Sequence, residues 1–285
     1  MPTDLLQTAV EAARRGAATL LSAFRGEHLE VEEKARHDLV TSADRASEAA
    51  IRAFIEERFP AHAILAEEGG LSGGGEDGES FEWIVDPLDG TTNFAQGLPN
   101  FSVSIACRRG RERLVGVVFD PLGENLFVAE RGSGARWNGR PMRVSSRPGL
   151  SEAFLATGFP FRARAALDLY LEVFHAVFLE ARAIRRLGSA AMDLAYVAAG
   201  IFDGFFEFHL SPWDTAAGSL LIEEAGGRVT DIDGGDRFLE TGNVVAGPAA
   251  VARELQKVIA SVANEGKLRD LGLSPTGLAA ARMLE

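Results

Sequence analysis

Two aspartates that could bind a cation follow a short apolar run. Residues 83–85 have the pattern of a buried strand, and Asp86 and Asp89 come directly after them. A proline between them and Gly90 behind them favour a tight turn capped by its own aspartates. The surroundings favour a different role, because residues 59–107 contain no Lys or Arg but contain Glu67, Glu68, Glu76, Asp77, Glu79, Glu82, Asp86 and Asp89. Carboxylates without basic partners either have shifted pKa values or bind cations.

A second stretch without basic residues strengthens this interpretation. Residues 187–227 also lack Lys and Arg, and their acidic residues are Asp193, Asp203, Glu207, Asp214, Glu223 and Glu224. Asp214 has a simple structural explanation, since it could cap a helix that begins at Thr215. Its carboxylate could still contribute to a cation site, while the start of the helix offers partial positive charge to an anion.

Glu67, Asp86, Asp89 and Asp214 would repel one another strongly if they converged. Like charges about 4 Å apart cost roughly 4 kcal/mol per pair at an effective dielectric constant near 20. Four ionised carboxylates would therefore need divalent cations, and oxygen ligands beside a phosphate favour Mg²⁺. The turn would also direct the carbonyl of Leu88 inward as a further oxygen ligand.

Other kinds of phosphate and metal chemistry lack their motifs in this chain. A G-x-x-x-x-G-K-[ST] loop is absent, which excludes a P-loop NTPase. The sequence has no H-E-x-x-H or C-x-x-C pair, and the histidines are scattered at 28, 37, 62, 175 and 209, which argues against zinc. The two aspartates are three positions apart, unlike the D-x-D of phosphatases that form an aspartyl-phosphate. These exclusions favour metal-activated water as the nucleophile.

Composition limits the compartment and the partners. The 285 residues carry a net charge of -12, which argues against nucleic acid or an anionic membrane as the main partner. A phosphate ester remains compatible if metal ions supply positive charge. The single cysteine, Cys107, lies in an apolar run, which predicts a buried structural thiol and a reducing compartment. Because the first residues lack a basic region and no apolar run reaches 18 residues, we expect a cytoplasmic protein.

The predicted helices and strands alternate irregularly, which favours a layered mixed α/β architecture over a doubly wound parallel sheet. Two charged or glycine-rich segments, 27–37 and 69–80, are predicted to be surface loops. Helical spacing predicts helices at 4–24, 42–59, 165–183, 190–199, 215–225 and 249–262. Strands are predicted at 63–66, 101–107, 114–119, 125–129, 153–157, 204–208, 228–232 and 244–246, with another near 184.

Two long motifs and one short one carry a family resemblance. Residues 86–94, Asp-Pro-Leu-Asp-Gly-Thr-Thr-Asn-Phe, match D-P-[IL]-D-G-T-x-N-F, and residues 213–218, Trp-Asp-Thr-Ala-Ala-Gly, match W-D-x-A-[AG]-G. Glu67-Glu68 matches G-E-E, except that Ala66 replaces the glycine. With these motifs the chain resembles the inositol monophosphatase family of magnesium-dependent, lithium-sensitive sugar phosphatases.

The resemblance implies an α+β fold, the layered αβαβα sandwich of the sugar phosphatases. One catalytic unit would span residues 1–265, with an N-terminal α+β half at about 1–150 and a C-terminal α/β half at about 151–265. Residues 266–285 would be a C-terminal tail. The family usually dimerises, so the resemblance also implies a homodimer.

The resemblance also assigns roles in a site for two or three Mg²⁺ ions. Glu67, Asp86 and the carbonyl of Leu88 would hold the first ion, and Asp86, Asp89 and Asp214 the second. Thr91 with Glu67 would orient and deprotonate the attacking water. Backbone N–H groups of Gly90 and Thr91 would bind the phosphate. Lys34 and Asp44 match, more loosely, a mobile loop near a third and weaker ion.

The substrate side of the site is assigned by further matches. Residues 188–190 resemble the segment whose backbone meets the sugar, which makes Ser189 and Ala190 candidates beside Asp89 and Asp214. Glu207 stands where relatives bind substrate hydroxyls, and a buried core glutamate is not a comfortable alternative. Arg185 would approach either the substrate or a subunit interface, and a salt-bridged surface arginine is an equal alternative.

The function implied is a Mg²⁺-dependent phosphomonoesterase for a small polyol or sugar phosphate, with myo-inositol 1-phosphate as the best candidate. Thr92-Asn93-Phe94 fits a 3′-phosphoadenosine 5′-phosphate phosphatase or a large-type fructose bisphosphatase less well. Fructose 1,6-bisphosphate and histidinol phosphate stay open as substrates. A regulatory or binding protein with the same fold is the alternative from another class, since some bacterial relatives associate with the transcription machinery.

Overall fold

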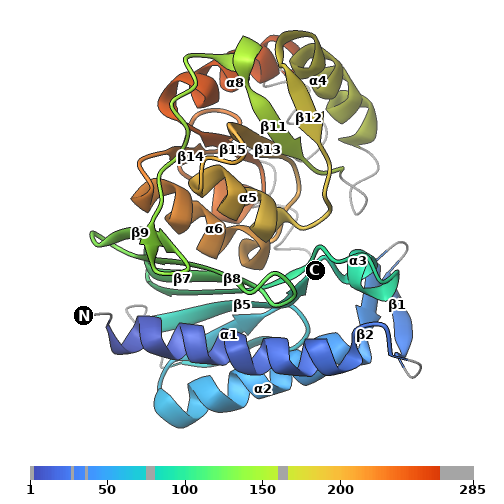
Figure 1. Ribbon diagram of the computed structural model, residues 1–285, viewed down its shortest axis with the longest axis vertical. Helices are drawn as coiled ribbons and strands as arrows, with labels where there is room; N and C mark the ends of the chain where they lie inside the picture. The colour runs from blue at the N-terminus through green and yellow to red at the C-terminus, as the bar shows by residue number, and fades with distance from the viewer. Residues whose placement is uncertain (1–2, 27–28, 36–37, 75–80, 160–165, 264–285) are drawn as a thin grey trace.

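Two mixed β-sheets alternate with three layers of helices in the computed structural model (Figure 1). The structure describes residues 3–26, 29–35, 38–74, 81–159 and 166–263, with the backbone only at 34, 35 and 38. The layers follow in the order α1 with α2, an eight-stranded sheet, α5 with α6, a five-stranded sheet, and α4 with α8. The predicted αβαβα sandwich is confirmed.

Helices α1 (Asp4–Ala23) and α2 (Ser42–Arg58) cover one face of the larger sheet. Ala9, Ala13 and Leu20 recur at helical spacing on α1, and all three are fully buried. The two helices approach closely because Gly16 has no side chain, and a Cβ atom there would lie 2.7 Å from Cδ1 of Ile51 on α2. The alanine-rich pattern of the sequence thus produces a thin, tightly packed outer layer.

The eight-stranded sheet has the order β10-β9-β8-β7-β6-β5-β3-β4. β5 pairs in parallel with β3 and antiparallel with β6, and its residues 83–89 are buried because helices cover both faces. The strands are β3 (Ala63–Ala66), β4 (Gly70–Gly73), β5 (Phe81–Asp89), β6 (Ser102–Arg109), β7 (Glu112–Asp120), β8 (Asn125–Glu130), β9 (Gly134–Trp137) and β10 (Arg140–Pro141). The short helix α3 (Thr91–Ala95) follows β5 directly.

Helices α5 (Ala190–Ala198) and α6 (Pro212–Glu224) fill the space between the two sheets. Residues 214–222 of α6 are all buried, as expected for a helix that is surrounded by protein on every side. Gly218 permits the close packing of this pair, because a Cβ atom there would lie 2.5 Å from Cβ of Leu194 on α5. The middle layer therefore joins both sheets into one core.

The five-stranded sheet has the order β12-β11-β13-β15-β14, and α4 and α8 cover its outer face. Its elements are η1 (Leu150–Glu152), β11 (Phe154–Thr157), α4 (Leu167–Glu180), β12 (Ala183–Arg185), β13 (Gly204–Glu207), β14 (Arg228–Thr230), α7 (Phe238–Thr241), β15 (Val244–Gly247) and α8 (Ala249–Val262). Among the described residues, no helix combines the length and the hydropathy needed to cross a bilayer.

Two of the predicted loops contain strands. Within 27–37, β1 (Val31–Ala35) pairs antiparallel with β2 (Asp38–Thr41). Within 69–80, β4 pairs antiparallel with β3. Backbone hydrogen bonds form these ladders without an apolar pattern, so composition does not reveal them. Residues 27–28, 36–37 and 75–80 of these segments, and the predicted tail, lie outside the described residues.

The prediction that Cys107 is a buried structural thiol is confirmed, and it has a measurable consequence. Cys107 is 0% exposed, and burial raises the pKa of its thiol to about 12. Since the thiolate is the reactive form, only about one thiol in ten thousand would be ionised at pH 8. We expect no reaction with a chromogenic disulfide reagent in the folded protein and one equivalent after unfolding in guanidinium. Rapid reaction of the folded protein would contradict this burial.

Candidate active site

Asp86 and Asp89 both lie within β5, which continues through them instead of ending in the predicted turn. Asp86 pairs with Ser104 of β6 and Asp89 pairs with Ser102, so three steps along β5 match two along β6. This register shift is a bulge. In a regular strand, positions three apart point to opposite faces, whereas here the two carboxylates lie together. The bulge is the local feature that makes one site from this pair.

Asp214 reaches the same site from the first turn of α6. The helix begins at Pro212, and Asp214 is its third residue, where its Oδ2 accepts a 2.6 Å hydrogen bond from the backbone N–H of Ser211. The predicted helix start at Thr215 is therefore wrong, because proline is well suited to the first helical position. Since α6 packs on β5, β6 and β7, its N-terminal turn lies beside the bulge.

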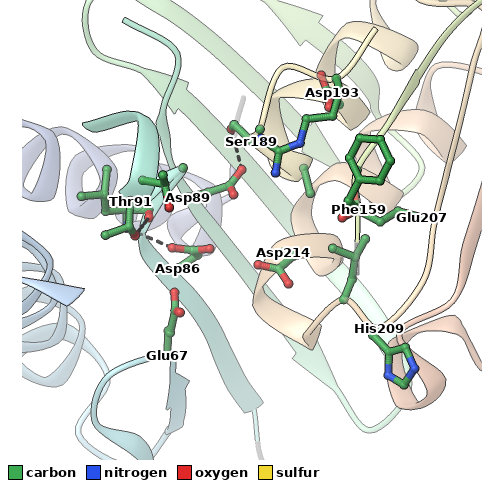
Figure 2. Close-up of a pocket in the computed structure, with 18 of the residues that line it drawn as sticks. Glu67, Asp86, Asp89, Thr91, Phe159, Ser189, Asp193, Glu207, His209 and Asp214 are labelled. Carbon is green, nitrogen blue, oxygen red and sulfur yellow. Dashed lines mark hydrogen bonds between the residues drawn. The ribbon is translucent and has the colours of Figure 1, made fainter. Parts of the chain in front are cut away.

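The three aspartates form a buried cluster in which ligand oxygens lie within 4.8 Å of one another. Glu67 follows β3 and is held beside β5 by a 3.2 Å hydrogen bond from its N–H to the carbonyl of Val85. Figure 2 shows all four carboxylates directed toward a common centre. Burial, followed by the charges of Glu67, Asp89 and Asp214, raises the pKa of Asp86 well above its ordinary value. Burial raises the pKa of Asp89 to about 6.

These carboxylates fit a hard divalent cation. Oxygen-only donor sets of this kind suit Mg²⁺, and a bound cation would offset the burial and the mutual repulsion that raise the two pKa values. Neighbouring groups also fix the orientation of the aspartates. The hydroxyl of Ser189 and the N–H of Ala191 donate to Oδ2 of Asp89 at 2.6 and 2.7 Å, and the N–H of Leu88 donates to Oδ1 of Asp86 at 3.0 Å. Such outer contacts are typical of metal sites.

Thr91 connects this cluster to α2. Its hydroxyl lies 3.0 Å from Oδ1 of Asp44 and 3.0 Å from the carbonyl oxygen of Leu88. Asp44 is fully buried in the first turn of α2, where the hydroxyl of Thr41 donates to its Oδ2 at 2.5 Å. Asp44 thus belongs to the helix predicted at 42–59, where the capping box fixes it, and not to the loop that the looser family match implied. Lys34 belongs to β1, and its side chain lies outside the described part of the structure.

A pocket of about 600 Å³ opens over the cluster, and its lining includes most of the predicted site residues. The predicted residues that line it are Glu67, Asp86, Leu88, Asp89, Gly90, Thr91, Ser189, Ala190, Glu207 and Asp214. Gly90 has φ +95, and a Cβ atom there would lie 3.0 Å from the carbonyl oxygen of Asn100. Glycine at this position allows the turn from β5 into α3 both its positive φ and its close approach to the backbone of Asn100.

Arg185 is a predicted substrate residue that does not line the pocket. Its guanidinium lies over the ring of Phe154 at 4.8 Å, and the next residue, Arg186, lines the pocket instead. Successive side chains of an extended chain point in opposite directions, so one arginine at the end of β12 faces away from the site. Of the alternatives left open for Arg185, this exposed position agrees with a surface arginine, and the basic side chain at the pocket is that of Arg186.

Comparison with known proteins decides the family. A profile of the inositol monophosphatase family matches residues 1–267. The chain belongs to the inositol monophosphatase family. Within it, the chain is similar to the Nus factor SuhB of Pseudomonas aeruginosa, with 48% identity over 246 residues, 85% of this chain and 91% of that protein.

Solved structures of family members agree with this assignment. The extragenic suppressor protein suhB of Bartonella henselae matches with a TM-score of 0.86 and 40% identity, over 90% of this chain and 98% of that one. The Thermotoga maritima IMPase matches with a TM-score of 0.82 and 37% identity, over 91% and 98% of the two chains. The inositol monophosphatase fold is thus shared across nearly the full length of each protein.

Two pocket residues of this family member were not singled out from the sequence. Asp193 lies on α5 four residues after Ser189, and that helical spacing was the signal for it. Burial raises the pKa of Asp193 well above its ordinary value. His209 lines the pocket two residues after Glu207, although the scattered histidines gave no motif. Figure 2 shows both side chains across the pocket from Thr91 and Glu67.

His209 has a strained backbone, which leads to a testable prediction. Its φ of +62 lies in the left-handed region, which costs a residue with a Cβ atom about 1 kcal/mol relative to glycine. We expect His209→Gly to be more stable than His209→Ala by about 1 kcal/mol, because both remove the imidazole but only glycine relieves the strain. Urea unfolding of the two variants measures the difference. Equal stabilities would show that the position is unstrained.

Proposed function

We propose that this protein is a Mg²⁺-dependent phosphomonoesterase that hydrolyses a small polyol or sugar phosphate, with myo-inositol 1-phosphate as the best candidate. The observation that carries the proposal is the buried cluster of Asp86, Asp89 and Asp214 beside Glu67, at one end of a pocket that has polar groups at its other end. Membership of the inositol monophosphatase family supports the reaction class.

The proposed cation ligands follow from the cluster. Glu67, Asp86 and the carbonyl of Leu88 would hold one Mg²⁺, and Asp86, Asp89 and Asp214 a second. When bound, Mg²⁺ neutralises these carboxylates and the phosphate and activates water as a nucleophile. A third ion near Asp44 remains part of the proposal, since Asp44 lies behind Thr91 and burial raises the pKa of its carboxyl.

The protein groups around the cluster would orient the reactants. The Thr91 hydroxyl, 3.0 Å from Asp44 Oδ1, can pass its proton toward that carboxylate and accept one from the attacking water, with Glu67 as the second group on that water. Backbone N–H groups of Gly90 and Thr91 would donate to the phosphate oxygens. The water oxygen forms a bond to phosphorus as the ester P–O bond breaks on the opposite side. The leaving alkoxide takes up a proton to become the alcohol, and the configuration at phosphorus is inverted.

Phosphate release over a panel of esters tests the proposal. The panel contains myo-inositol 1-phosphate, fructose 1,6-bisphosphate, histidinol phosphate and 3′-phosphoadenosine 5′-phosphate, each with Mg²⁺, with EDTA, and with Mg²⁺ plus Li⁺. We expect fastest release from myo-inositol 1-phosphate, loss of activity in EDTA and inhibition by Li⁺. If none of the four esters released phosphate with Mg²⁺ present, the protein would not be a phosphatase of this class.

A binding role is the second candidate function, and the names of relatives favour it. The proteins of Pseudomonas aeruginosa and Escherichia coli that are 48% and 46% identical to this chain are both named Nus factor SuhB. We propose that this protein also binds the transcription machinery. Co-migration with purified transcription complexes in size-exclusion chromatography would support this, and separate elution at all concentrations would contradict it.

A homodimer is the third part of the proposal, and the outer face of α4 supports it. Leu171, Phe178 and Leu179 of this helix are 45%, 60% and 68% exposed, an unusual cluster of apolar surface. A two-fold contact through α4 would cover the same patch on both chains. Sedimentation velocity should show a species with the mass of two chains, and Phe178→Glu should shift it toward one. A monomer at micromolar concentrations would contradict this.

A further inference from the structure

Asp193 is a buried carboxyl in the pocket wall that the proposed reaction does not use. It is 1% exposed, and its Oδ1 has no hydrogen-bond partner among the described residues. Burying a polar atom without a partner costs free energy, so such atoms are rare in folded proteins. Because Asp193 lines the pocket, a molecule bound there is the natural source of the missing hydrogen bond.

The position of Asp193 on α5 places it on the same wall of the pocket as Ser189 and Ala190. Ser189, Ala190 and Asp193 are related by three- and four-residue steps and share one face of the helix start. The hydroxyl of Ser189 donates to Asp89, so this face of α5 begins at the carboxylate cluster and continues to Asp193. Figure 2 shows Asp193 across the pocket from Thr91, on which the phosphate would lie.

The charges that act on Asp193 place it among the polar groups of that wall. Burial raises the pKa of Asp193 most, the charges of Glu207 and then Asp89 raise it further, and the charge of Arg186 lowers it. Glu207 itself lies against Gly158, where a Cβ atom would be 2.0 Å from its Oε1. Two carboxyl groups from different elements, α5 and β13, therefore border the same end of the pocket. An alcohol that carries several hydroxyl groups can bond to both, whereas an apolar alcohol can bond to neither.

We propose that Asp193 is a specificity-determining residue whose carboxyl hydrogen-bonds a hydroxyl of the leaving polyol, remote from the phosphate. The proposal rests on the proposed phosphatase function and adds the substrate group that is recognised. It implies that the enzyme distinguishes a polyhydroxylated leaving group from one of the same shape without hydroxyls. The discrimination belongs to Asp193 and its neighbours, while the phosphate is bound elsewhere.

A cycle of two substrates and three variants tests this inference. The substrates are myo-inositol 1-phosphate and cyclohexyl phosphate, which share a six-membered ring but differ in hydroxyl groups. A hydrogen bond to a buried carboxyl contributes enough for Asp193→Ala to lower kcat/KM for the inositol ester about 10- to 100-fold, mainly through KM. Cleavage of cyclohexyl phosphate should change less than about threefold. Asp193→Asn, which keeps a donor and an acceptor, should recover most of the loss.

A matched control separates recognition from structure. Asp203 is also a buried aspartate, 4% exposed, but it does not line the pocket, and its Oδ2 accepts a 2.8 Å hydrogen bond from the N–H of Phe154. Asp203→Asn should leave the ratio of the two kcat/KM values unchanged. If Asp193→Ala lowered both substrates equally, or neither, Asp193 would be structural and the proposal would be overturned.

A binding measurement keeps the inference separate from the proposed reaction. Saturation-transfer NMR detects free myo-inositol and cyclohexanol on the folded protein without turnover. We expect a signal from myo-inositol with the wild type that is strongly reduced in Asp193→Ala and kept in Asp203→Asn. If no ester is hydrolysed but this pattern appears, the phosphatase proposal fails and the recognition proposal stands. If esters are hydrolysed but the Asp193→Ala signal is undiminished, the recognition proposal fails alone.

Discussion

Asp89→Asn is expected to reduce kcat/KM for phosphate ester hydrolysis by roughly 1000-fold or more while the protein remains folded. The substitution removes one negative charge from the proposed second cation site. It keeps an oxygen that can accept the hydrogen bonds from Ser189 and Ala191, which in the wild type are 2.6 and 2.7 Å long. Phosphate release at saturating Mg²⁺ measures the effect, and circular dichroism checks the fold.

The matched control is an aspartate away from the pocket. Asp168 lies exposed in the first turn of α4, and Asp168→Asn should retain wild-type activity. The proposed two-ion arrangement predicts the same large loss for Asp214→Asn, because both residues belong to one cluster. If either cluster variant kept more than about a tenth of wild-type activity, the assignment of the cation ligands would be wrong.

The second large effect concerns stability without a bound cation. Burial raises the pKa of Asp89 from 3.8 to about 6, and the pKa of Asp86 is raised as well. A carboxyl whose pKa is higher in the folded state favours folding below its unfolded pKa and loses that contribution as pH rises through the folded value. For Asp89 the loss is at most about 3 kcal/mol between pH 4 and pH 7. EDTA-treated protein should therefore become less stable over this interval.

Mg²⁺ should reverse this loss, because a ligand that binds only the folded state stabilises it. We expect Mg²⁺ to raise the melting temperature by several degrees at pH 7.5 and much less at pH 5, where the cluster is partly protonated. Asp89→Asn in EDTA should be more stable than the wild type at pH 7.5, with the difference vanishing near pH 4. A wild type whose stability in EDTA is constant from pH 4 to pH 7 would contradict the repulsion among these carboxylates.

The two predictions assign opposite effects, on stability and on activity, to the carboxylate of Asp89. Asp89 is expected to lower the stability of the cation-free protein and to support activity when cations are bound. Functional sites commonly contain residues that lower the stability of the protein but are needed for its activity. A variant that gained stability and kept activity would show that the cluster serves neither role.

The sequence by itself determined the residue types of the site and most of the helices and strands, and the family resemblance added the order of the layers. Two stretches without Lys or Arg, at 59–107 and 187–227, indicated that the acidic residues within them lack local basic partners. Periodicity predicted the helices that form the outer and middle layers. A helix that is buried on one face has a stripe of apolar residues, and a helix that is buried on all faces is apolar all round. The motifs at 86–94 and 213–218, with Glu67-Glu68, were sufficient to indicate the family.

Only the tertiary structure decided how these residues meet. The bulge in β5 turns Asp86 and Asp89 to one side, and its register shift depends on pairing with β6 rather than on local propensity. The capping box of α2 lies in the helix predicted from the sequence, but only the packing of α2 against the end of β5 puts Asp44 behind Thr91. Which of two adjacent arginines faces the pocket depended on the end of β12. Asp193 and His209 became visible as pocket residues only when α5 and the segment after β13 were brought to the same pocket as the end of β5. Long-range pairing and packing set these relations, and no local pattern encodes them.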